Sequence, residues 1–518
     1  MTNLFQEVSR LYRKRDSGYN LSTMCATSDV SRNLLANLSA IASRCNCQAY
    51  VVGGFVRDWL LGRETVDIDI AVSCDPGGIA ARLADSSGGK AFLLDSTNRV
   101  FRVVVDVGEK QWQLDITCFS GSIENDLARR DFTVNAMAVR LEEFISDESA
   151  SVIDPFAGRN DLEARIIRAV RRDIFRKDAV RLLRAVRLAR ELEFTIEPGT
   201  EGLIRKHSRL TASVPGERVR EELLRMLAIP GSAGALRYLD DLGLLTEIIP
   251  ELRAMKGVEQ PKEHYWDVFD HSIETVSAVE FLLRESSWKY GGCRLLDELC
   301  WSQELREHFD EEVANGSSRR LLLKLGALLH DVAKPATKTI DETGRIRFIG
   351  HTKLGAAMAA SILQRLRFSN REVRLVENLV YNHLRPVQMS SEGLPTRRAV
   401  YRFFRDTEGA GVDVLFLALA DFLATQGPKL DISEWKRHNQ LVSHILQEYR
   451  RQQSTALPVK LLDGHDLMGI FGLKPGRLIG ELLAEVREAQ AAGDISTREE
   501  AIELVRRHLE KRQCSLAC

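Results

Sequence analysis

Residues 51–72 read VVGGFVRDWLLGRETVDIDIAV, and this stretch decides the fold of the first half of the chain. An apolar run, a Gly-Gly turn, a short helical segment and a second apolar run predict two strands joined by a turn and a helix. Gly53 and Gly54 have no Cβ atom, so the backbone can come close to a ligand at the turn. Arg57 follows the turn, where it can meet a phosphate in a two-pronged contact.

The second strand carries Asp67 and Asp69 two positions apart, so both carboxylates point to the same face. Two carboxylates side by side repel each other unless a cation lies between them. A pair of Mg²⁺ ions meets this need, because Mg²⁺ prefers hard oxygen ligands that it shares with phosphates. A solvated acidic strand end is the alternative for an isolated D-x-D pattern, but the glycines and the arginine upstream favour the metal site.

The composition is ordinary for a globular protein of several domains, with 518 residues, 44% hydrophobic, 28% charged, and a net charge of −1. Nine cysteines are scattered and form no C-x-x-C pair, so the sequence predicts neither a zinc ribbon nor a disulfide framework, and a reducing cytoplasm fits best. No apolar run is long enough to span a bilayer, and the first residues lack the core of a signal peptide. We therefore expect a cytoplasmic protein with no membrane partner.

Residues 1–45 predict a helical N-terminal extension, with its best helix at 31–43, and residues 46–148 predict an α/β palm-like domain. The expected strands of this domain are 49–52, 67–72, 100–106 and 111–117. The last of them places Asp115 among apolar residues, where an unpaired carboxylate is costly. Asp115 either completes a three-carboxylate metal site with the two earlier aspartates or is an exposed strand residue, and spacing alone does not separate these alternatives.

Residues 128–139, ARRDFTVNAMAV, carry the next group of polar side chains. Arg129 and Arg130 supply positive charge for phosphates. Asp131 and Asn135 lie four positions apart on an expected helix, so they share one face. The alternative is an ordinary salt-bridged helix start.

A basic stretch that we expect to be helical follows at 165–190, with ten lysines or arginines against two aspartates. Arg181, Arg184 and Arg187 repeat every three residues, and on a helix they form one ridge. Asp178 lies one step earlier on the same ridge. Arginine donates hydrogen bonds and aspartate accepts them. One Asp–Arg pair can therefore accept cytosine and adenine, which offer an amine donor beside a ring-nitrogen acceptor, and reject uracil and guanine. A basic solvated helix face is the alternative.

These motifs occur in one order together with DPFAGRNDLEARIIR at 154–168 and PGERVREELLRML at 215–227. In this order they resemble the class II tRNA nucleotidyltransferase and bacterial poly(A) polymerase family. The resemblance covers about residues 46–260 and implies a nucleotidyltransferase β-superfamily palm, a mixed sheet with helices, followed by an all-α neck, body, HD domain and tail. It also implies template-independent addition of C, C and A to the 3′ end of tRNA from CTP and ATP, with two Mg²⁺ ions at the head.

The resemblance implies a role for each matching residue. The implied catalytic residues are Asp67, Asp69 and Asp115, the first two as Mg²⁺ ligands and the third as the additional carboxylate. The implied nucleotide-binding residues are Gly53, Gly54, Arg57, Arg130, Asp131, Asn135, Asp178, Arg181, Arg184 and Arg187. Among these, Asp178 and Arg181 would act as an amino-acid template for the incoming base. One departure is Lys177, where the family usually has an acidic residue.

The second half of the chain carries a separate set of histidines and aspartates in helical surroundings. Its members are His271, His330, Asp331, His351, His383 and Asp421. Imidazole together with carboxylate suits a divalent transition metal better than Ca²⁺, and a bound metal can activate water for phosphoester hydrolysis. Their order resembles the HD-superfamily metal-dependent phosphohydrolases, whose domain is often fused to bacterial enzymes of the first family. The alternative is that the HD domain serves only as an RNA-binding scaffold.

We expect a neck at 149–214 that selects the base and binds RNA, a body at 215–260, an HD domain at 261–430 and a helical, tRNA-binding tail at 431–518. The first functional hypothesis is addition of the whole CCA end to the tRNA acceptor stem. A poly(A) polymerase, or an enzyme that adds only CC or only A, shares the same motifs and stays open. A hypothesis of another class is an HD-domain phosphohydrolase that acts on nucleotides or on RNA 2′,3′-ends.

Overall fold

The computed structural model describes residues 29–96, 99–108, 110–146, 150–314, 316–390, 393–454 and 460–516. The chain divides into two compact units, residues 1–214 and residues 215–518. The helix expected at 31–43 is confirmed as α2, Asp29–Arg44, and the rest of the expected N-terminal extension lies mostly outside the described residues.

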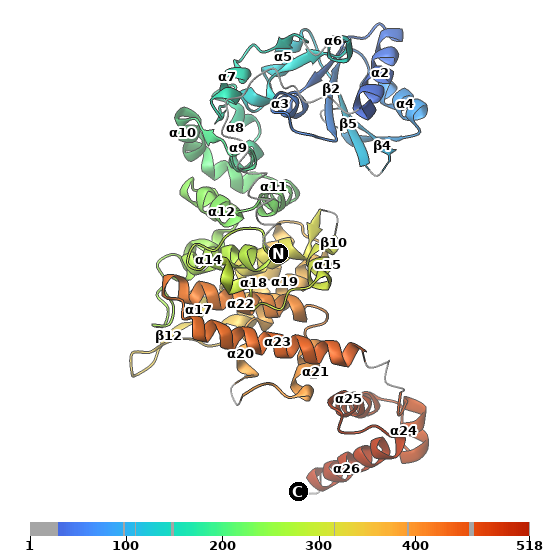
Figure 1. Cartoon of the computed structure of the whole chain (residues 1–518), viewed down its shortest axis with the longest axis vertical. Helices are drawn as coiled ribbons and strands as arrows, with labels where there is room; N and C mark the ends of the chain where they lie inside the picture. Colours follow the sequence, from blue (N-terminus) through green and yellow to red (C-terminus); the bar gives the residue numbers. More distant parts are fainter. Residues whose placement is uncertain are drawn as a thin grey trace. The chain divides into compact units, whose positions relative to one another are not determined.

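A seven-stranded mixed sheet forms the centre of the first unit, in the order β3-β4-β5-β2-β1-β6-β7 (Figure 1). Its strands are β1 Ala49–Val52, β2 Asp67–Val72, β3 Lys90–Asp95, β4 Val100–Val107, β5 Lys110–Cys118, β6 Ala138–Arg140 and β7 Val152–Ile153. Within the described strands of this sheet, β2 and β5 pair in parallel and all other neighbours pair antiparallel. The mixed sheet and its four expected strands are therefore confirmed, while β3, β6 and β7 have no counterpart in the prediction.

The apolar positions of the two decisive strands form the core of this sheet, since Val51, Val52, Ile68 and Ile70 are each at most 1% exposed. Helix α4 packs against β4 and against α2. It begins after Asp75, whose side chain caps its first turn. The helices of this region are α3 Gly54–Leu60, α4 Pro76–Ser87, α5 Ile123–Leu127, α6 Leu141–Ser146 and α7 Gly158–Glu163.

The prediction of a helix within 128–139 is wrong. The structure has only the three-residue 3₁₀ helix η1, Thr133–Asn135, followed by β6. An α-helix does not form there, because Phe132 pairs with Ala169 in a β-bridge and the Asp131 side chain accepts a hydrogen bond from the backbone N–H of Phe132. The two polar side chains of this segment nevertheless meet, because Asn135 Nδ2 donates to Asp131 Oδ1 at 3.3 Å.

The basic stretch at 165–190 is only partly helical. The elements of this stretch are β8 Ile166–Ile167, α8 Ile174–Lys177 and α9 Val180–Leu192, and they are followed by β9 Thr195–Ile196, α10 Pro198–His207 and η2 Ser208–Ser213. Asp178 lies between α8 and α9 with φ −151°, so the expectation that it continues the helical ridge is wrong. The three arginines of the ridge do lie on α9, whose opposite face is buried.

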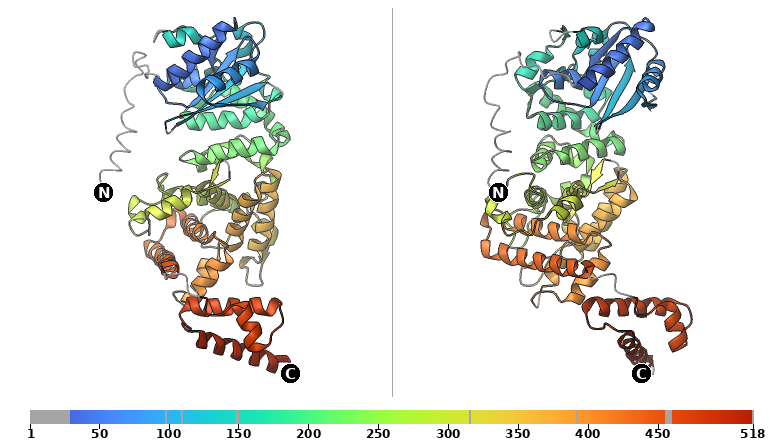
Figure 2. Two further views of the ribbon diagram at one scale, coloured as in Figure 1. Left: turned by 90° about the vertical axis from the view of Figure 1, so that its right-hand side faces the viewer. Right: turned by 45° about the vertical axis from the view of Figure 1, so that its right-hand side comes forward.

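The second unit is helical, and α14 packs against α16 and α22 while α18 packs against α19. Figure 2 shows α18 and α19, in gold, side by side. The longer helices are α11 Gly216–Ala228, α12 Ser232–Asp241, α14 Val268–Leu282, α16 Arg319–Leu329, α18 His351–Arg365, α19 Asn370–Asn382, α21 Arg397–Asp406, α22 Gly411–Gln426, α23 Ile432–Ser454, α25 Arg477–Ala492 and α26 Arg498–Leu516. The shorter elements are α13 Leu245–Ile248, η3 Pro250–Met255, η4 Cys293–Leu296, α15 Gln303–Asp310, β10 Glu312–Ala314, β11 Ser317–Ser318, α17 Lys334–Thr337, β12 Lys338–Ile340, β13 Ile346–Phe348, α20 Arg385–Gln388, η5 Gly427–Lys429 and α24 Gly464–Phe471.

Two buried charged groups join the helices of this unit. Lys324 of α16 is fully buried, and its ammonium lies 3.1 Å from the Glu280 carboxylate of α14. The fully buried Glu372 of α19 accepts hydrogen bonds from Arg220 of α11 at 2.9 Å and from Ser317 at 2.7 Å. Each buried charge is thus paired, as a low-dielectric interior requires.

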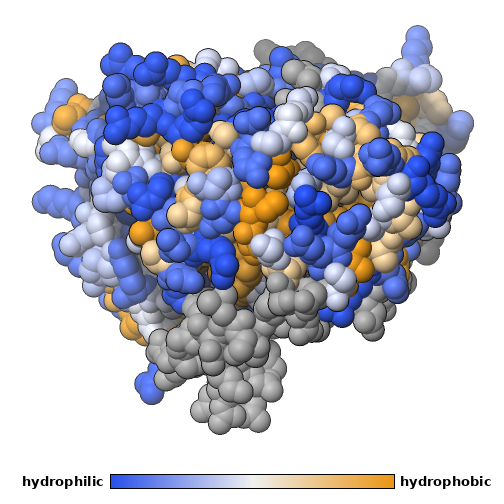
Figure 3. All heavy atoms as spheres, turned by 90° about the horizontal axis from the view of Figure 1, so that it is seen from above, coloured by the Kyte–Doolittle hydropathy of each residue, from blue (hydrophilic) through white to orange (hydrophobic). Residues whose placement is uncertain are grey.

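One disulfide, Cys47–Cys74, joins the segment before β1 to the segment after β2. The sequence predicts no disulfide framework, and no C-x-x-C pattern marks this pair because its members are 27 residues apart. No helix within the described ranges has the length and apolar character needed to cross a membrane. The face drawn in Figure 3 is mainly hydrophilic, with a narrow hydrophobic strip near its centre.

Candidate functional site

The turn after β1, at Gly53 and Gly54, lies against the carboxylate of Asp69. Gly53 has φ 71°, and its N–H donates to the carbonyl oxygen of Met137 at 3.2 Å. A Cβ atom at Gly53 would lie 2.5 Å from Nη1 of Arg130 and 2.8 Å from Oδ2 of Asp69. Glycine is favoured at this position, because any other residue would have a strained backbone and would displace both charged groups.

The three predicted carboxylates lie in neighbouring positions on two parallel strands. Asp67 and Asp69 are on β2, and Asp69 is the register partner of Asp115 on β5. Burial raises the pKa of Asp69, and the Asp115 charge adds to this, while the positive charge of Arg130 acts in the opposite direction. An anionic cluster that disfavours its own ionisation is a suitable place for cations, and all its donor atoms are hard oxygens.

Arg102 on β4 is a member of this cluster that sequence reasoning missed. It is the register partner of Asp115, and its Nε and Nη2 each donate to one oxygen of that carboxylate at 2.7 Å. No local motif marks this arginine, because the contact depends on which strands are neighbours in the sheet.

Arg57 is 7% exposed, and its guanidinium is engaged by protein groups. Its Nε and Nη2 donate to the two oxygens of Asp58 at 2.9 and 2.7 Å, and its Nη1 donates to Oδ1 of Asn135 at 2.8 Å. Asn135 in turn contacts Asp131, and Arg184 Nη1 donates to Asp131 Oδ2 at 3.1 Å. This chain of contacts connects helix α3, which follows the Gly53–Gly54 turn, to helix α9. A phosphate contact by Arg57 stays a prediction.

Asp131 is the point where this chain meets α9. Burial would raise its pKa, but the charges of Arg184 and Arg181 outweigh burial and hold the pKa of Asp131 below its usual value. Asp131 is therefore an ionised, buried anchor for the arginine ridge.

The proposed base-selecting pair lies at the start of α9. Nε of Arg181 is 3.9 Å from Oδ2 of Asp178, and Nη2 of Arg181 donates to the Arg129 carbonyl oxygen at 3.0 Å. Nη1 of Arg181 is buried and has no hydrogen-bond partner in the described part of the chain. A buried unpaired donor is costly, so it is available for an acceptor on a ligand. Arg187 differs, because it is 8% exposed and pairs with Glu191.

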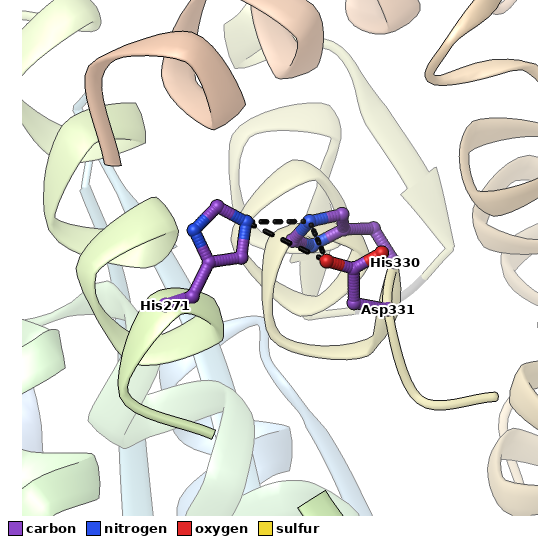
Figure 4. Close-up of side chains that lie close together, drawn as sticks. All are labelled: His271, His330 and Asp331. Carbon is purple, nitrogen blue, oxygen red and sulfur yellow. Dashed lines mark hydrogen bonds and ion pairs between the residues drawn. The ribbon is translucent and has the colours of Figure 1, made fainter. Parts of the chain in front are cut away.

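The second unit gathers the predicted histidines and aspartates around one carboxylate, that of Asp331. Figure 4 shows His271 of α14 facing His330 and Asp331, which follow the end of α16. Oδ2 of Asp331 lies 3.5 Å from Nε2 of His271 and 3.2 Å from Nε2 of His330. Asp421 of α22 lies on the same side, with Oδ1 3.0 Å from Nε2 of His271.

The other oxygen of Asp331 faces the remaining two histidines. Its Oδ1 is 3.6 Å from Nε2 of His351 and 3.9 Å from Nε2 of His383. Five of the six predicted side chains therefore form two groups that share Asp331, and each group has its ligand atoms close enough to hold a metal ion. The sixth, Asp421, lies beside the first group.

Three of these histidines are held in the tautomer that a metal needs. Nδ1 of His330, His351 and His383 lies 2.8, 2.6 and 2.7 Å from a backbone carbonyl oxygen three residues earlier. A carbonyl only accepts, so Nδ1 carries the proton and Nε2 points into the cluster. Burial alone would lower the pKa of His330, but Asp331 and Asp421 outweigh it and raise that pKa to about 10. Nε2 of His330 lies 3.2 Å from Nε2 of His271.

Known protein families match most of the chain. Residues 49–168 match the poly A polymerase head domain, residues 193–256 match a family described as the probable RNA and SrmB-binding site of polymerase A, and residues 268–426 match the HD domain. The chain is 36% identical to the A-adding tRNA nucleotidyltransferase of Deinococcus radiodurans, over 89% of this chain and 96% of that protein. It is 34% identical to the CC-adding tRNA nucleotidyltransferase of Thermus thermophilus, over 88% and 92%.

The chain belongs to the tRNA nucleotidyltransferase family. Solved structures of CCA-adding enzymes have the same fold as this nucleotidyltransferase at low identity. A Thermotoga maritima CCA-adding enzyme complexed with tRNA matches 94% of this chain and 97% of its own with a TM-score of 0.58 and 21% identity. A CCA-adding enzyme in complex with CTP matches 95% and 99% with a TM-score of 0.62 and 22% identity. The expected family, fold class and enzyme class are confirmed.

This nucleotidyltransferase has two further polar residues at its HD site, Lys334 and His264, that sequence reasoning did not single out. The buried Lys334 lies 2.6 Å from Oδ2 of Asp331, and its Nζ donates to Gln260 at 2.7 Å. The ring of His264 lies 5.4 Å from that of His271, and burial, together with the charge of Lys334, lowers the pKa of His264 to about 3. Lys334 follows the His-Asp pair by one helical turn, which is a spacing that sequence reasoning could have used.

Proposed function

We propose that this enzyme adds nucleotides from CTP or ATP to the 3′ end of tRNA and makes part of the CCA end. Asp67 and Asp69 on β2, with Asp69 in register with Asp115 on β5 and Arg130 beside the Gly53 turn, are the observation that supports nucleotidyl transfer best. The relatives that match over most of this chain, including the Deinococcus and Thermus proteins, carry the names of A-adding or CC-adding enzymes. This favours a divided task over the whole CCA addition that the motifs suggest first.

The reaction needs no side-chain nucleophile. The 3′-hydroxyl of the RNA attacks the α-phosphorus of the nucleotide, a P–O bond forms, and pyrophosphate leaves. Asp67 and Asp69 would hold Mg²⁺, with Asp115 as the third carboxylate, because hard carboxylate oxygens that repel one another fit this ion. Bound Mg²⁺ would lower the pKa of the hydroxyl and offset charge on the leaving phosphates. Arg130 lies beside the same turn, where its guanidinium would bind the triphosphate.

Base choice would rest on Asp178 and Arg181. The unpartnered Nη1 of Arg181 would donate to a ring nitrogen, and Asp178 would accept from the exocyclic amine of cytosine or adenine. Arg184, fixed by Asp131, would hold the ridge in place. The matched RNA-binding segment would contact the tRNA backbone by shape and charge.

Three tRNA transcripts test the specificity, one lacking the whole CCA end, one lacking only the terminal A, and one complete. Addition of A alone to the second transcript, or of two C residues alone to the first, supports a divided task. Completion of all three nucleotides overturns it. Growth of a long A tract on any of the RNAs overturns the assignment to the tRNA end.

A pair of variants tests the carboxylate centre. Asp67→Ala with Asp69→Ala should abolish nucleotide addition. Asp106→Ala, which removes an exposed carboxylate from β4 of the same sheet, is the matched control and should leave addition unchanged. Addition that persists in the double variant would show that the chemistry lies elsewhere.

The HD site supports a second candidate function, a divalent-metal phosphohydrolase. Oδ1 of Asp331 and Nε2 of His351 are buried without a hydrogen-bond partner among the described residues, and the tautomer of His351 presents Nε2 to that oxygen. Imidazole and carboxylate together fit a transition metal, and His271, His330, Asp331, His351, His383 and Asp421 would hold it. A bound metal would activate water there for attack on a phosphoester.

Metal analysis and hydrolysis of a 2′,3′-cyclic nucleotide test this site. Wild-type protein should retain a transition metal after dialysis, and His330→Ala should lose both the metal and the hydrolysis while nucleotide addition persists. His465→Ala is the control, because His465 is an exposed histidine of another His-Asp dipeptide in α24. Hydrolysis that survives in His330→Ala would contradict the proposal.

A further inference from the structure

Three charged side chains form a row across three adjacent strands of the head sheet. Asp69 of β2 is the register partner of Asp115 of β5, and Asp115 is the register partner of Arg102 of β4. Register partners on neighbouring strands point to the same face and have Cβ atoms about 5 Å apart. Arg102 is therefore a fixed neighbour of the carboxylate centre, placed by strand register rather than by a flexible loop.

The contact between Arg102 and Asp115 is a two-pronged ion pair. Nε donates to Oδ1 and Nη2 donates to Oδ2, both at 2.7 Å, and the two side chains are only 29% and 23% exposed. The planar guanidinium fork fixes the plane of the carboxylate as well as its position. A carboxylate has about four lone-pair positions, so the fork leaves others for a second partner.

Arg102 also interacts electrostatically with the other two carboxylates. The hydrogen bonds to Asp115 raise the pKa of Arg102 most, and the charges of Asp67 and Asp69 add to that effect. The cluster of three carboxylates thus has one permanent cation of its own, since an arginine stays protonated at every working pH.

We propose that Arg102 is a positioning residue with two effects on the carboxylate centre, and this rests on the nucleotidyl-transfer function proposed above. It orients Asp115 for its role as third carboxylate. It also offsets one negative charge while no metal is bound, so it stabilises the metal-free head and weakens metal binding. A neutral side chain at this position removes both the charge and the fork, whereas lysine retains only the charge, so the two substitutions together separate the two effects.

Mn²⁺ binding to the full-length protein without nucleotide, followed by electron paramagnetic resonance, is the test that does not depend on turnover. Every protein in this test also carries His330→Ala, so that the metal site proposed for the HD domain does not contribute. Arg102→Met should bind Mn²⁺ about tenfold more tightly, since it removes a repelling cation. Its metal-free form should melt at a lower temperature. Arg102→Lys should bind Mn²⁺ as the wild type does. At saturating metal, kcat for addition should fall at least about tenfold in both variants, with little change in KM, because Asp115 has lost its fork.

Arg99→Met is the matched control, because Arg99 lies just before β4 and pairs with Asp75 at 2.7 Å in an exposed contact. It should change neither Mn²⁺ affinity nor kcat. Unchanged Mn²⁺ affinity in Arg102→Met would overturn the counter-cation role, and unchanged kcat in both Arg102 variants would overturn the positioning role. Failure of the proposed function itself is distinguishable, because Asp67→Ala with Asp69→Ala would then leave Mn²⁺ binding intact.

Discussion

Replacing Gly53 with alanine should reduce nucleotide addition far more than it reduces stability. Gly53 has φ 71° and ψ −135°, a backbone conformation that is essentially restricted to glycine, so alanine there costs on the order of 1–3 kcal/mol. The new Cβ would lie 2.5 Å from Nη1 of Arg130 and 2.8 Å from Oδ2 of Asp69, so each group must move by about 0.5–1 Å to reach normal contact distances. A displacement of about 1 Å at reacting groups costs on the order of 10²-fold in rate, and we expect that loss in kcat/KM for nucleotide addition.

Gly62→Ala separates the backbone strain from the collision. Gly62 has φ 65°, and no described atom lies within 4 Å of the position that its Cβ would take, so alanine there also has a positive φ but displaces nothing. Both variants should lose about 2–4 °C in melting temperature for each kcal/mol of strain. Only Gly53→Ala should lose activity. The reasoning is refuted if Gly53→Ala adds nucleotides within about twofold of the Gly62→Ala rate.

Three further substitutions test the charge networks. Glu372→Gln should destabilise the protein at pH 7, because hydrogen bonds from Ser317 and Arg220 outweigh burial and lower the pKa of Glu372 in the folded protein. A lowered pKa stabilises the fold above the unfolded value of about 4.3. In urea denaturation, the difference in unfolding free energy between wild type and variant should therefore shrink as the pH falls through the folded pKa. Lys324→Met should cost about 3–5 kcal/mol in urea denaturation, and adding Glu280→Gln should restore part of it, whereas no recovery would contradict the pairing. Asp58→Asn should raise KM for the nucleotide about tenfold in steady-state addition assays, because the Arg57 guanidinium loses a charged partner. An unchanged KM would argue against a phosphate contact by Arg57.

The sequence predicts the central strands well because their signals are local. β1 and β2 begin and end at the expected residues, since alternation and flanking glycines mark them. β3, Lys90–Asp95, escapes the prediction because it is an edge strand whose residues are mostly exposed, so no alternation marks a buried face. The spacing of Asp131 and Asn135 predicts a shared helix face, yet a 3₁₀ turn and a β-bridge bring them together instead.

The site shows the same division between local and long-range signals. The aspartates of β2 are readable because they are two positions apart in one strand. The role of Arg102 cannot be predicted from the sequence, because its contact with Asp115 depends on β4 and β5 being neighbours in the sheet and on their register. The six HD side chains come from helices that lie far apart along the chain, and only the resemblance of their order to a known pattern identifies them as a set.

The Cys47–Cys74 bridge has a consequence for proteolysis. Strands β1 and β2, with the Gly53–Gly54 turn after β1 and with Asp67 and Asp69 on β2, lie between the bridged cysteines. The segment at 61–66 between these strands is at least partly exposed. A protease cut after Arg63 would leave both fragments in one covalent molecule as long as the bridge is oxidised. On a denaturing gel, such a nicked protein would run as a single band without reductant and as two bands with it. Gels run only under reducing conditions would therefore show cleavage even where the disulfide still joins the two fragments.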